Sequence, residues 1–367
     1  MITSRLKTWN LNNKKVLMRI DGNVPLANGI ILNDFRLRAL TKTLDFLKEQ
    51  KAFVTIITHL GRPKNFDSLL STAPLALWFA KAGYHNVTVQ ENLRFDPREK
   101  EGNGEYARDL ATGFDFYLNE AWGVIHRNDT SIALLPNYFP PENRSIGFLI
   151  EQELAALTPL RTAPAEPFFV LLGGCKGDKI ASLLSLIEWG KVSHIMVLPG
   201  IAFTFLKAYG FETGESLVLD THIEACRMII KTAAEKNIEL ILPIDYLVAH
   251  DHKTEFFDAQ TLPTTGIGIG IGPKTRALIK TQTQKSKTVF FNGALALDEY
   301  PESGHEFEIL LQEIAHIKTN KIAGGGDTVA ALEKAHLVSS FSWCSTGGGS
   351  TLAYISGAFF KGLDALR

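Results

Sequence analysis

Cysteine is scarce in this 367-residue sequence, and its three cysteines, Cys175, Cys226 and Cys344, lie far apart. An odd number of scattered cysteines excludes a disulfide framework and lacks the paired spacing of a zinc site. Because disulfides are rare in reducing compartments, this usage favours a cytoplasmic location.

Long apolar runs and an excess charge of one sign are missing as well. No run approaches the roughly 20 apolar residues that a membrane span needs, and residues 1–11 lack the apolar core of a signal peptide. The 38 Lys and Arg nearly balance the 39 Asp and Glu. We therefore expect a globular protein whose partners include neither nucleic acid nor a membrane.

Short apolar strands alternate with amphipathic helical patterns along the whole chain. The predicted strands are 14–20, 53–58, 87–89, 114–118, 168–172, 194–198, 240–242, 288–291, 321–323 and 341–344. This alternation is typical of parallel sheets covered on both faces. Since 367 residues exceed one ordinary core, the predicted fold class is α/β, with two doubly wound parallel-sheet (Rossmann-like) domains joined by a helical hinge.

A helical pattern at 146–160, followed by a proline-rich stretch at 162–167, marks the predicted boundary between the domains. The predicted parts are a domain at 1–148, an interdomain helix at 149–164 and a domain at 165–352. We also expect one helix at about 35–50, and a constrained loop where glycines alternate from 266 to 272.

Two glycine-rich turns in the second half each follow a short strand and precede a helix. They are Gly324-Gly325-Gly326-Asp327-Thr328 and Ser345-Thr346-Gly347-Gly348-Gly349-Ser350. Glycine lets the backbone approach a ligand, and a helix N-terminus favours phosphate. Asp327 can hold a hard cation beside the phosphate or simply cap the helix.

A third glycine-rich turn follows the predicted strand 168–172. It contains Gly174, Lys176 and Lys179, so it places two positive charges near a helix start. Its spacing is not that of a Walker A loop. Because parallel strands end at one edge of a sheet, the three turns together predict a site for an anionic ligand.

Arginines and histidines follow the predicted strands of the first half. They are Arg36, His59, Arg62, Arg94, His126 and Arg127. A single arginine is more often a solvated surface residue, but several at strand ends favour a common site. Because the guanidinium fork pairs with carboxylate or phosphate at two points, the pattern predicts a site for a small molecule with several negative charges.

Taken in order, these motifs resemble the phosphoglycerate kinase family over nearly the whole chain. The resemblance is carried by Asp21-Gly22-Asn23-Val24-Pro25, His59-Leu60-Gly61-Arg62-Pro63, Glu91-Asn92-Leu93-Arg94-Phe95, Asn119-Glu120-Ala121-Trp122-Gly123 with His126-Arg127, Gly173-Gly174-Cys175-Lys176, Thr204-Phe205-Leu206-Lys207, Ile271-Gly272-Pro273-Lys274-Thr275 and the two turns at 324–328 and 345–349.

The resemblance implies reversible phosphoryl transfer between 1,3-bisphosphoglycerate and MgADP, giving 3-phosphoglycerate and MgATP, a step of glycolysis and gluconeogenesis. The implied phosphoglycerate-binding residues are Asp21, Asn23, Arg36, His59, Arg62, Arg94 and Arg127. The implied nucleotide-binding residues are Gly174, Lys176, Lys179, Glu299, Gly325, Gly326, Asp327 and Thr328. The implied catalytic residues are Arg36, Lys176, Gly348 and Gly349.

The resemblance further implies Mg²⁺ as cofactor, carried on Asp327, and a C-terminal segment at 353–367 that returns to the first domain. We expect a monomer. Phosphoryl transfer depends on alignment and charge neutralisation more than on covalent chemistry. We therefore assign neither His59 nor His126 as a general base and expect both to contact phosphate.

Departures from the family pattern leave an alternative open. Gly22 stands where the family has Phe, and Lys176 and Lys179 are three positions apart where the family has four. The alternative is a paralogue that binds phosphoglycerate or nucleotide but turns over slowly. A nicotinamide-dependent dehydrogenase is disfavoured, because no Gly-x-Gly-x-x-Gly turn follows the first strand.

Overall fold

The computed structural model describes residues 2–295, 297 and 299–367. These residues divide into two compact units. The first contains the chain up to Leu157 together with Ala358–Arg367, and the second is Thr158–Gly357. The first division falls within helix α7 (Phe148–Thr162).

A parallel sheet forms the centre of the first unit, with strand order β5-β4-β1-β6-β7. Its strands are β1 (Lys15–Ile20), β4 (Phe53–Ile57), β5 (Val87–Val89), β6 (Phe116–Glu120) and β7 (Arg144–Ile146). The short strands β2 (Leu26–Ala27) and β3 (Ile30–Ile31) pair antiparallel. The helices are α1 (Phe35–Arg38), α2 (Thr41–Glu49), α3 (Ala73–Lys81), α4 (Arg98–Glu101), α5 (Gly104–Ala111), α6 (Thr130–Ala133) and α15 (Lys361–Asp364).

Side chains of the central strand β1 alternate between the two faces of this sheet, as in any β-strand. Val16, Met18 and Ile20 belong to the apolar core that α2 and α3 cover. Arg19 lies on the opposite face, where its Nε donates to Ser131 Oγ of α6 at 2.7 Å. Strand β1 thus places the charged side chain of Arg19 in the interior of the unit.

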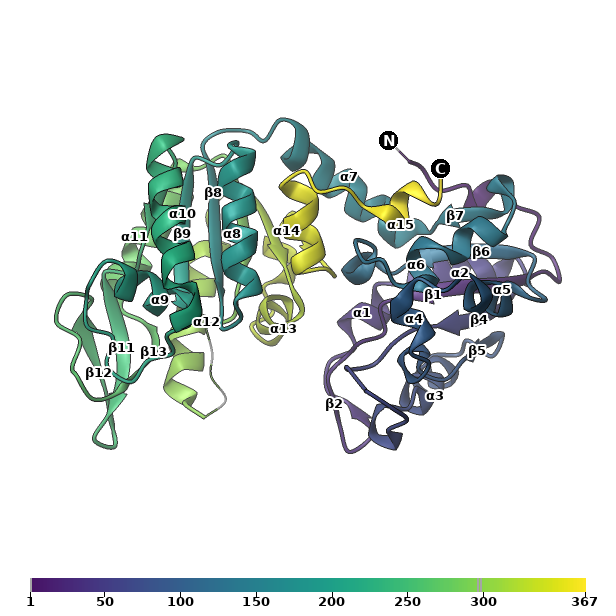
Figure 1. Ribbon diagram of the computed structural model, residues 1–367, viewed down its shortest axis with the longest axis horizontal. Helices are drawn as coiled ribbons and strands as arrows, with labels where there is room; N and C mark the ends of the chain where they lie inside the picture. Colours follow the sequence, from purple (N-terminus) through teal and green to yellow (C-terminus); the bar gives the residue numbers. More distant parts are fainter. Residues whose placement is uncertain (1, 296, 298) are drawn as a thin grey trace. The chain divides into compact units, whose positions relative to one another are not determined.

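A second parallel sheet forms the centre of the second unit, with strand order β10-β9-β8-β14-β15-β16. Its strands are β8 (Phe168–Gly174), β9 (His194–Gly200), β10 (Glu239–Ile241), β14 (Thr288–Asn292), β15 (Asn320–Gly324) and β16 (Trp343–Ser345). The strands β11 (Asp245–His250), β12 (Lys253–Asp258) and β13 (Ile267–Ile271) form a separate antiparallel sheet, seen at the lower left of Figure 1.

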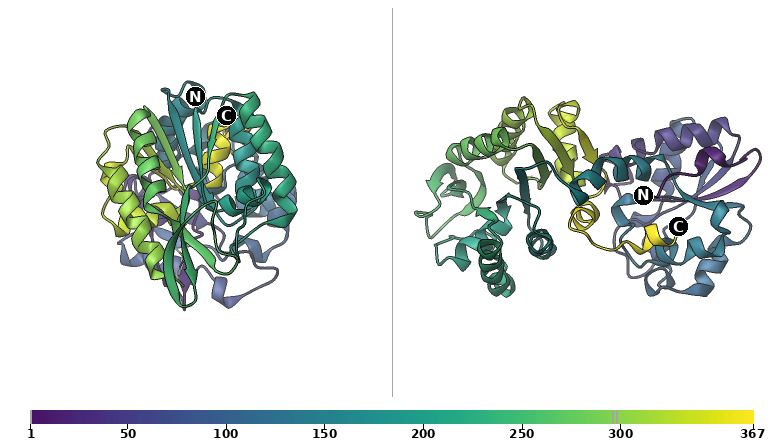
Figure 2. Two further views of the ribbon diagram at one scale, coloured as in Figure 1. Left: turned by 90° about the vertical axis from the view of Figure 1, so that its left-hand side faces the viewer. Right: turned by 90° about the horizontal axis from the view of Figure 1, so that it is seen from above.

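Helices cover both faces of the second parallel sheet, as the left view of Figure 2 shows with a teal layer and a lime-green layer on either side of the strands. The helices are α8 (Asp178–Trp189), α9 (Ile201–Ala208), α10 (Ile223–Glu235), α11 (Pro273–Lys285), α12 (Pro301–Ala315), α13 (Gly326–Lys334) and α14 (Gly349–Ile355). The predicted α/β class with parallel sheets is confirmed. Among the described residues, no helix is long and apolar enough to span a bilayer.

Three local predictions are wrong. The glycine run is the strand β13, in which a side chain on Gly268 would meet the Phe203 ring, with an added Cβ 2.1 Å from Cζ. The helix expected at 35–50 is divided between α1 and α2 at Ala39 and Leu40. The strand expected at 114–118 is shifted to Phe116–Glu120, so that Glu120 ends the strand instead of following it.

Candidate active site

In the first unit, hydrogen bonds join the loops after β1 and β4 to the turn after β5. Arg36 of α1 pairs with Asp21 (Nη1 to Oδ2, 3.2 Å) and donates to the carbonyl oxygen of Asn23 at 2.7 Å. Asn23 Oδ1 accepts from the Gly61 N–H at 2.9 Å, and Arg94 Nη1 donates to the Gly61 carbonyl at 2.6 Å. The structure therefore brings Asp21, Asn23, Arg36 and Arg94 together at one edge of the sheet.

His59 follows β4 and is 1% exposed. Burial holds its pKa well below the usual 6.5, and so do the nearby charges of Arg19, Arg94, Arg127 and Arg36. The charges of four arginines therefore act on the His59 ring. Arg127 is one of them, so it lies close enough to His59 to belong to the predicted cluster. A cluster of several arginines favours an anionic ligand.

Arg62 and His126 are the other two residues predicted for this site. Arg62 is exposed in the loop after β4. The His126 ring lies 5.9 Å from that of Phe360, in the C-terminal segment of the same unit. Burial lowers the pKa of His126, and the charge of Arg127 lowers it further.

Two buried nitrogens in this region, Nδ1 of His126 and Nε of Arg94, have no hydrogen-bond partner among the described residues. Buried polar atoms are nearly always paired. These two nitrogens are therefore candidates for contact with a ligand.

Residues missed in the sequence lie directly beneath the cluster. Arg19 and Glu99 are each 0% exposed, and Ser131 is bonded to both. The available signal was a single arginine inside the apolar run 16–20, since a charged side chain is almost never buried unless it is paired.

In the second unit, side-chain hydrogen bonds connect the ends of β14 and β15 with the start of α8. Lys179 Nζ donates to Asn292 Oδ1, and Asn292 Nδ2 donates to the Gly324 carbonyl. The Gly293 N–H donates to Thr328 Oγ1 at 2.9 Å. The buried Thr328 side chain therefore links the turn after β14 to the turn after β15. Lys179 is held, through Asn292, at the same edge of the sheet as the glycine turn after β15.

The two glycine turns at this edge contact each other directly. The Gly325 N–H donates to the Gly347 carbonyl at 2.9 Å. Gly325 has φ of +96°, and an added Cβ there would lie 2.8 Å from Nδ2 of Asn292. Only glycine combines this backbone conformation with such close approach. Gly326 and Gly349, the first residues of α13 and α14, are thereby brought near one another, and both are exposed.

The lysine-bearing turn and Asp327 belong to this edge as well. Gly174 has φ of +123° and lies against the Lys179 stem, since an added Cβ would be 3.5 Å from Cε. Burial lowers the pKa of Lys179, while Asp178 and Asp327 oppose the shift through their charges. Asp327 and Lys176 are both exposed, and both are close enough for their charges to act on Lys179.

Glu299 is exposed in the turn that precedes α12. The structure thus brings together the predicted glycines, Lys179, Asp327 and Thr328 at one edge of the sheet.

A family model described as phosphoglycerate kinase matches residues 6–89 and 76–358. The chain is 33% identical over 393 residues to the phosphoglycerate kinase of Dictyoglomus turgidum, with 99% of this chain and 98% of the relative covered. It is 34% identical over 397 residues to that of Borrelia hermsii, with 100% of both covered. The chain belongs to the phosphoglycerate kinase family.

A solved structure supports the same assignment. The phosphoglycerate kinase of Coxiella burnetii superposes with a TM-score of 0.80 at 32% identity, covering 98% of this chain and 97% of that one. The predicted family and the predicted enzyme class, a phosphotransferase with a carboxyl acceptor, are confirmed. Nothing in these likenesses favours the slow paralogue.

The departures from the phosphoglycerate kinase pattern can now be located. The Gly22 N–H donates to Thr58 Oγ1 at 2.8 Å, and an added Cβ would lie only 2.8 Å from that oxygen. Thr58 therefore occupies the space where an aromatic side chain at 22 would have to pass. In the shortened lysine turn, α8 begins at Asp178, one residue before Lys179.

The residues present fit magnesium only as a nucleotide-bound ion. Among the described residues, no group of three or more His, Cys, Asp or Glu side chains could hold a metal by itself. Asp327 is a single exposed carboxylate in the first turn of α13. Mg²⁺ in kinase sites is commonly held by one or two carboxylates together with substrate phosphates, which is the role Asp327 suits.

Proposed function

We propose that the chain transfers a phosphoryl group reversibly between 1,3-bisphosphoglycerate and MgADP, giving 3-phosphoglycerate and MgATP. The first unit binds the phosphoglycerate and the second binds the nucleotide. The observation that carries this proposal is the hydrogen-bonded cluster that holds Arg36 and Arg94 on the loops of Asn23 and Gly61, with Arg19 against the buried His59. A ligand complementary to this arginine cluster is a small molecule with several negative charges.

On the phosphoglycerate side, the cations are partly oriented before a ligand arrives. Arg36 is held by Asp21 and by the Asn23 carbonyl, so little side-chain entropy is lost when it meets an anion. Arg94 keeps its Nε unpaired. We assign Asp21 and Asn23 to the hydroxyl and carboxyl end of the substrate. We assign His59, Arg62, Arg94 and Arg127 to its remote phosphate.

On the nucleotide side, the glycine turns and the α13 N-terminus offer backbone N–H groups to phosphate oxygens. We assign Gly174, Lys179, Gly325, Gly326 and Thr328 to the nucleotide-binding edge, and Glu299 to the ribose hydroxyls. Asp327 would hold Mg²⁺, which neutralises charge on the phosphates when bound.

Catalysis by these residues is electrostatic. An acyl phosphate is a good leaving group, so the reaction needs no strong general base. The transferring group carries charge on its oxygens, and fixed donors aimed at that charge lower the barrier. We assign Lys176 and Arg36 to this neutralisation, aided by the backbone N–H groups of Gly348 and Gly349.

A coupled assay of ATP formation tests the proposal. We expect steady turnover for the natural chain and a loss of about 100-fold or more in Lys176→Ala. Lys280→Ala, an exposed lysine on α11, is the matched control and should keep full activity. A natural chain no faster than Lys176→Ala, yet still able to bind either ligand, would instead identify the slow paralogue.

A further inference from the structure

Beneath the arginine cluster, a buried chain of hydrogen bonds connects Glu99 to His59. The N–H and hydroxyl of Ser131 contact the two oxygens of Glu99, at 3.0 Å to Oε2 and 2.6 Å to Oε1. Arg19 Nε lies 2.7 Å from Ser131 Oγ, and Arg19 Nη2 lies 3.3 Å from His59 Nδ1. Arg19 and Glu99 are 0% exposed and His59 is 1% exposed, so solvent does not compete for these groups.

The direction of every bond in this chain follows from the chemistry of arginine. A guanidinium has donors only and keeps its proton in proteins. Ser131 Oγ therefore accepts from Arg19 Nε, which leaves its own hydrogen for Glu99 Oε1. By the same reasoning, His59 Nδ1 accepts from Arg19 and carries no hydrogen. A neutral imidazole with a bare Nδ1 holds its proton on Nε2.

We propose that Glu99, Ser131 and Arg19 are positioning residues that hold His59 as the neutral imidazole with its proton on Nε2. His59 then offers the anionic substrate a hydrogen-bond donor and does not act as a base. The tautomer is a property of the free protein, whereas the identity of the anion as phosphoglycerate rests on the proposed function.

The charges around His59 agree with a neutral ring. The cations that act on it are Arg19 on β1, Arg36 on α1, Arg94 in the turn Leu93–Phe95, and Arg127. Two acids of this region, Glu99 and Asp129, are each engaged with an arginine, at 3.8 Å to Arg19 and 3.7 Å to Arg94, and Asp21 pairs with Arg36 at 3.2 Å. Burial raises the pKa of Glu99, and the charge of Arg19 and the bonds from Ser131 oppose that shift.

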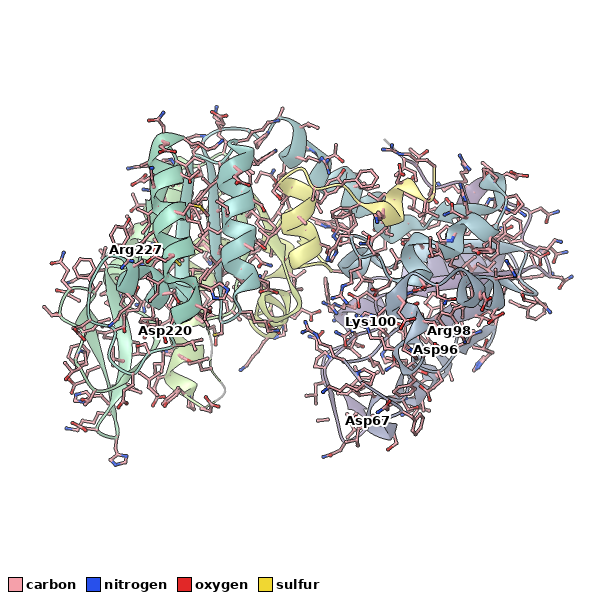
Figure 3. All side chains as sticks on the ribbon, in the orientation of Figure 1. Asp67, Asp96, Arg98, Lys100, Asp220 and Arg227 are labelled. Atoms are coloured by element: carbon pink, nitrogen blue, oxygen red, sulfur yellow. The ribbon has the colours of Figure 1, made fainter. Side chains whose placement is uncertain are left out.

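The helix that carries Glu99 provides its own control. Arg98 is partly exposed and pairs with Asp96 at 2.7 Å, and Lys100 is exposed (Figure 3). Glu101, on the same helix, is exposed too. Glu99→Gln and Glu101→Gln are thus the same chemical change on one short helix, made once inside the buried chain and once outside it.

Nitrogen-15 NMR of the ligand-free full-length chain tests the tautomer, with the His59 signals assigned from His59→Gln. We expect Nδ1 to appear unprotonated and Nε2 protonated from about pH 5.5 to about pH 8, a range in which an unperturbed histidine titrates. A hydrogen on Nδ1, or a ring that gains a second proton near its ordinary pKa, would overturn the proposal.

Ser131→Ala tests the positioning role, because it removes the bridging hydroxyl and leaves both buried charges in place. We expect a mixture of tautomers at His59 and about fivefold weaker phosphoglycerate binding, the loss typical of one hydrogen bond. Glu99→Gln should act in the same direction, and Glu101→Gln should match the natural chain. An unchanged His59 spectrum in Ser131→Ala would refute the positioning role.

Failure of the proposed function would look different. In that case the natural chain would show the Nε2 tautomer, and Ser131→Ala would disturb it, but phosphoglycerate would bind to neither protein.

Discussion

Lys179 Nζ donates a hydrogen bond to Oδ1 of Asn292, which joins the helix α8 to the end of strand β14. Because Asn292 also donates to the Gly324 carbonyl, one amide aligns the lysine with the glycine turn. Asn292→Ala should therefore weaken nucleotide binding about tenfold, the combined effect of two lost hydrogen bonds, and leave phosphoglycerate binding unchanged. Calorimetric titration with each ligand measures this, and Asn320→Ala on the neighbouring strand is the control.

Arg127→Ala should weaken phosphoglycerate binding by roughly 10- to 100-fold while nucleotide affinity stays the same, because a charge-assisted contact is worth about 1.5–3 kcal/mol. Arg62→Ala should act in the same direction. Arg108→Ala, an exposed arginine on α5, is the matched control. A fall in nucleotide affinity in place of phosphoglycerate affinity would reverse the assignment of the two units.

Asp327→Asn should abolish the gain in nucleotide affinity that Mg²⁺ gives the natural chain, because the amide keeps the size of the side chain but not its charge. Nucleotide titrations with and without the metal measure this gain. Asp220→Asn, an exposed acid of the same unit (Figure 3), should retain it. If the two titration curves of Asp327→Asn still differ as in the natural chain, the ion is held elsewhere.

Glu120 should make the first unit less stable as the pH rises. Its oxygens accept from the N–H groups of Leu149 and Ile150 at 3.1 and 3.0 Å, at the start of α7. Burial nevertheless raises the pKa of Glu120 from 4.5 to about 7. Between those values the folded chain keeps a proton that the unfolded chain releases, so the free energy of unfolding falls as the pH rises from about 4.5 to about 7.

The size of this effect is about 3 kcal/mol, since each pK unit corresponds to about 1.4 kcal/mol. Glu120→Gln cannot titrate and should lose that part of the pH dependence. Urea denaturation at about pH 5 and about pH 8 compares the two proteins, with the exposed Glu105→Gln as control. An identical pH dependence in the natural chain and in Glu120→Gln would contradict the raised pKa.

In the shortened lysine turn, a Cβ added to Gly177 would lie 2.4 Å from His222 Nε2. Gly177→Ala should push the turn or the imidazole aside and reduce turnover by up to about 100-fold, the effect of a 1 Å misplacement. His222→Ala removes the obstacle, so the double variant should recover most of the rate. Strictly additive losses in this double-mutant cycle would rule out the steric coupling.

Several parts of the site were predictable because their signals are local. Each strand end, glycine turn and following polar residue can be recognised from consecutive residues of the sequence. Parallel strands then bring their carboxyl ends to one edge of the sheet. Asp21, Arg36 and Arg94 are joined in this way through Asn23 and Gly61. The loop predicted for the glycine run at 266–272 was wrong. These residues form a strand because the Phe203 ring packs against Gly268, and that contact is not visible in the local sequence.

The order of motifs along the chain determined by itself the α/β class, the family and the chemical type of its ligands, since these depend on residue types and spacings. Only the tertiary structure decided that Arg19 lies beside His59 and is held there through Ser131 and Glu99. Residues 19, 59, 99 and 131 belong to separate strands, loops and helices, and no spacing along the chain relates them. Their burial, their bond directions and the tautomer we infer for His59 arise from packing, which exists only when the sheet and its helices have assembled.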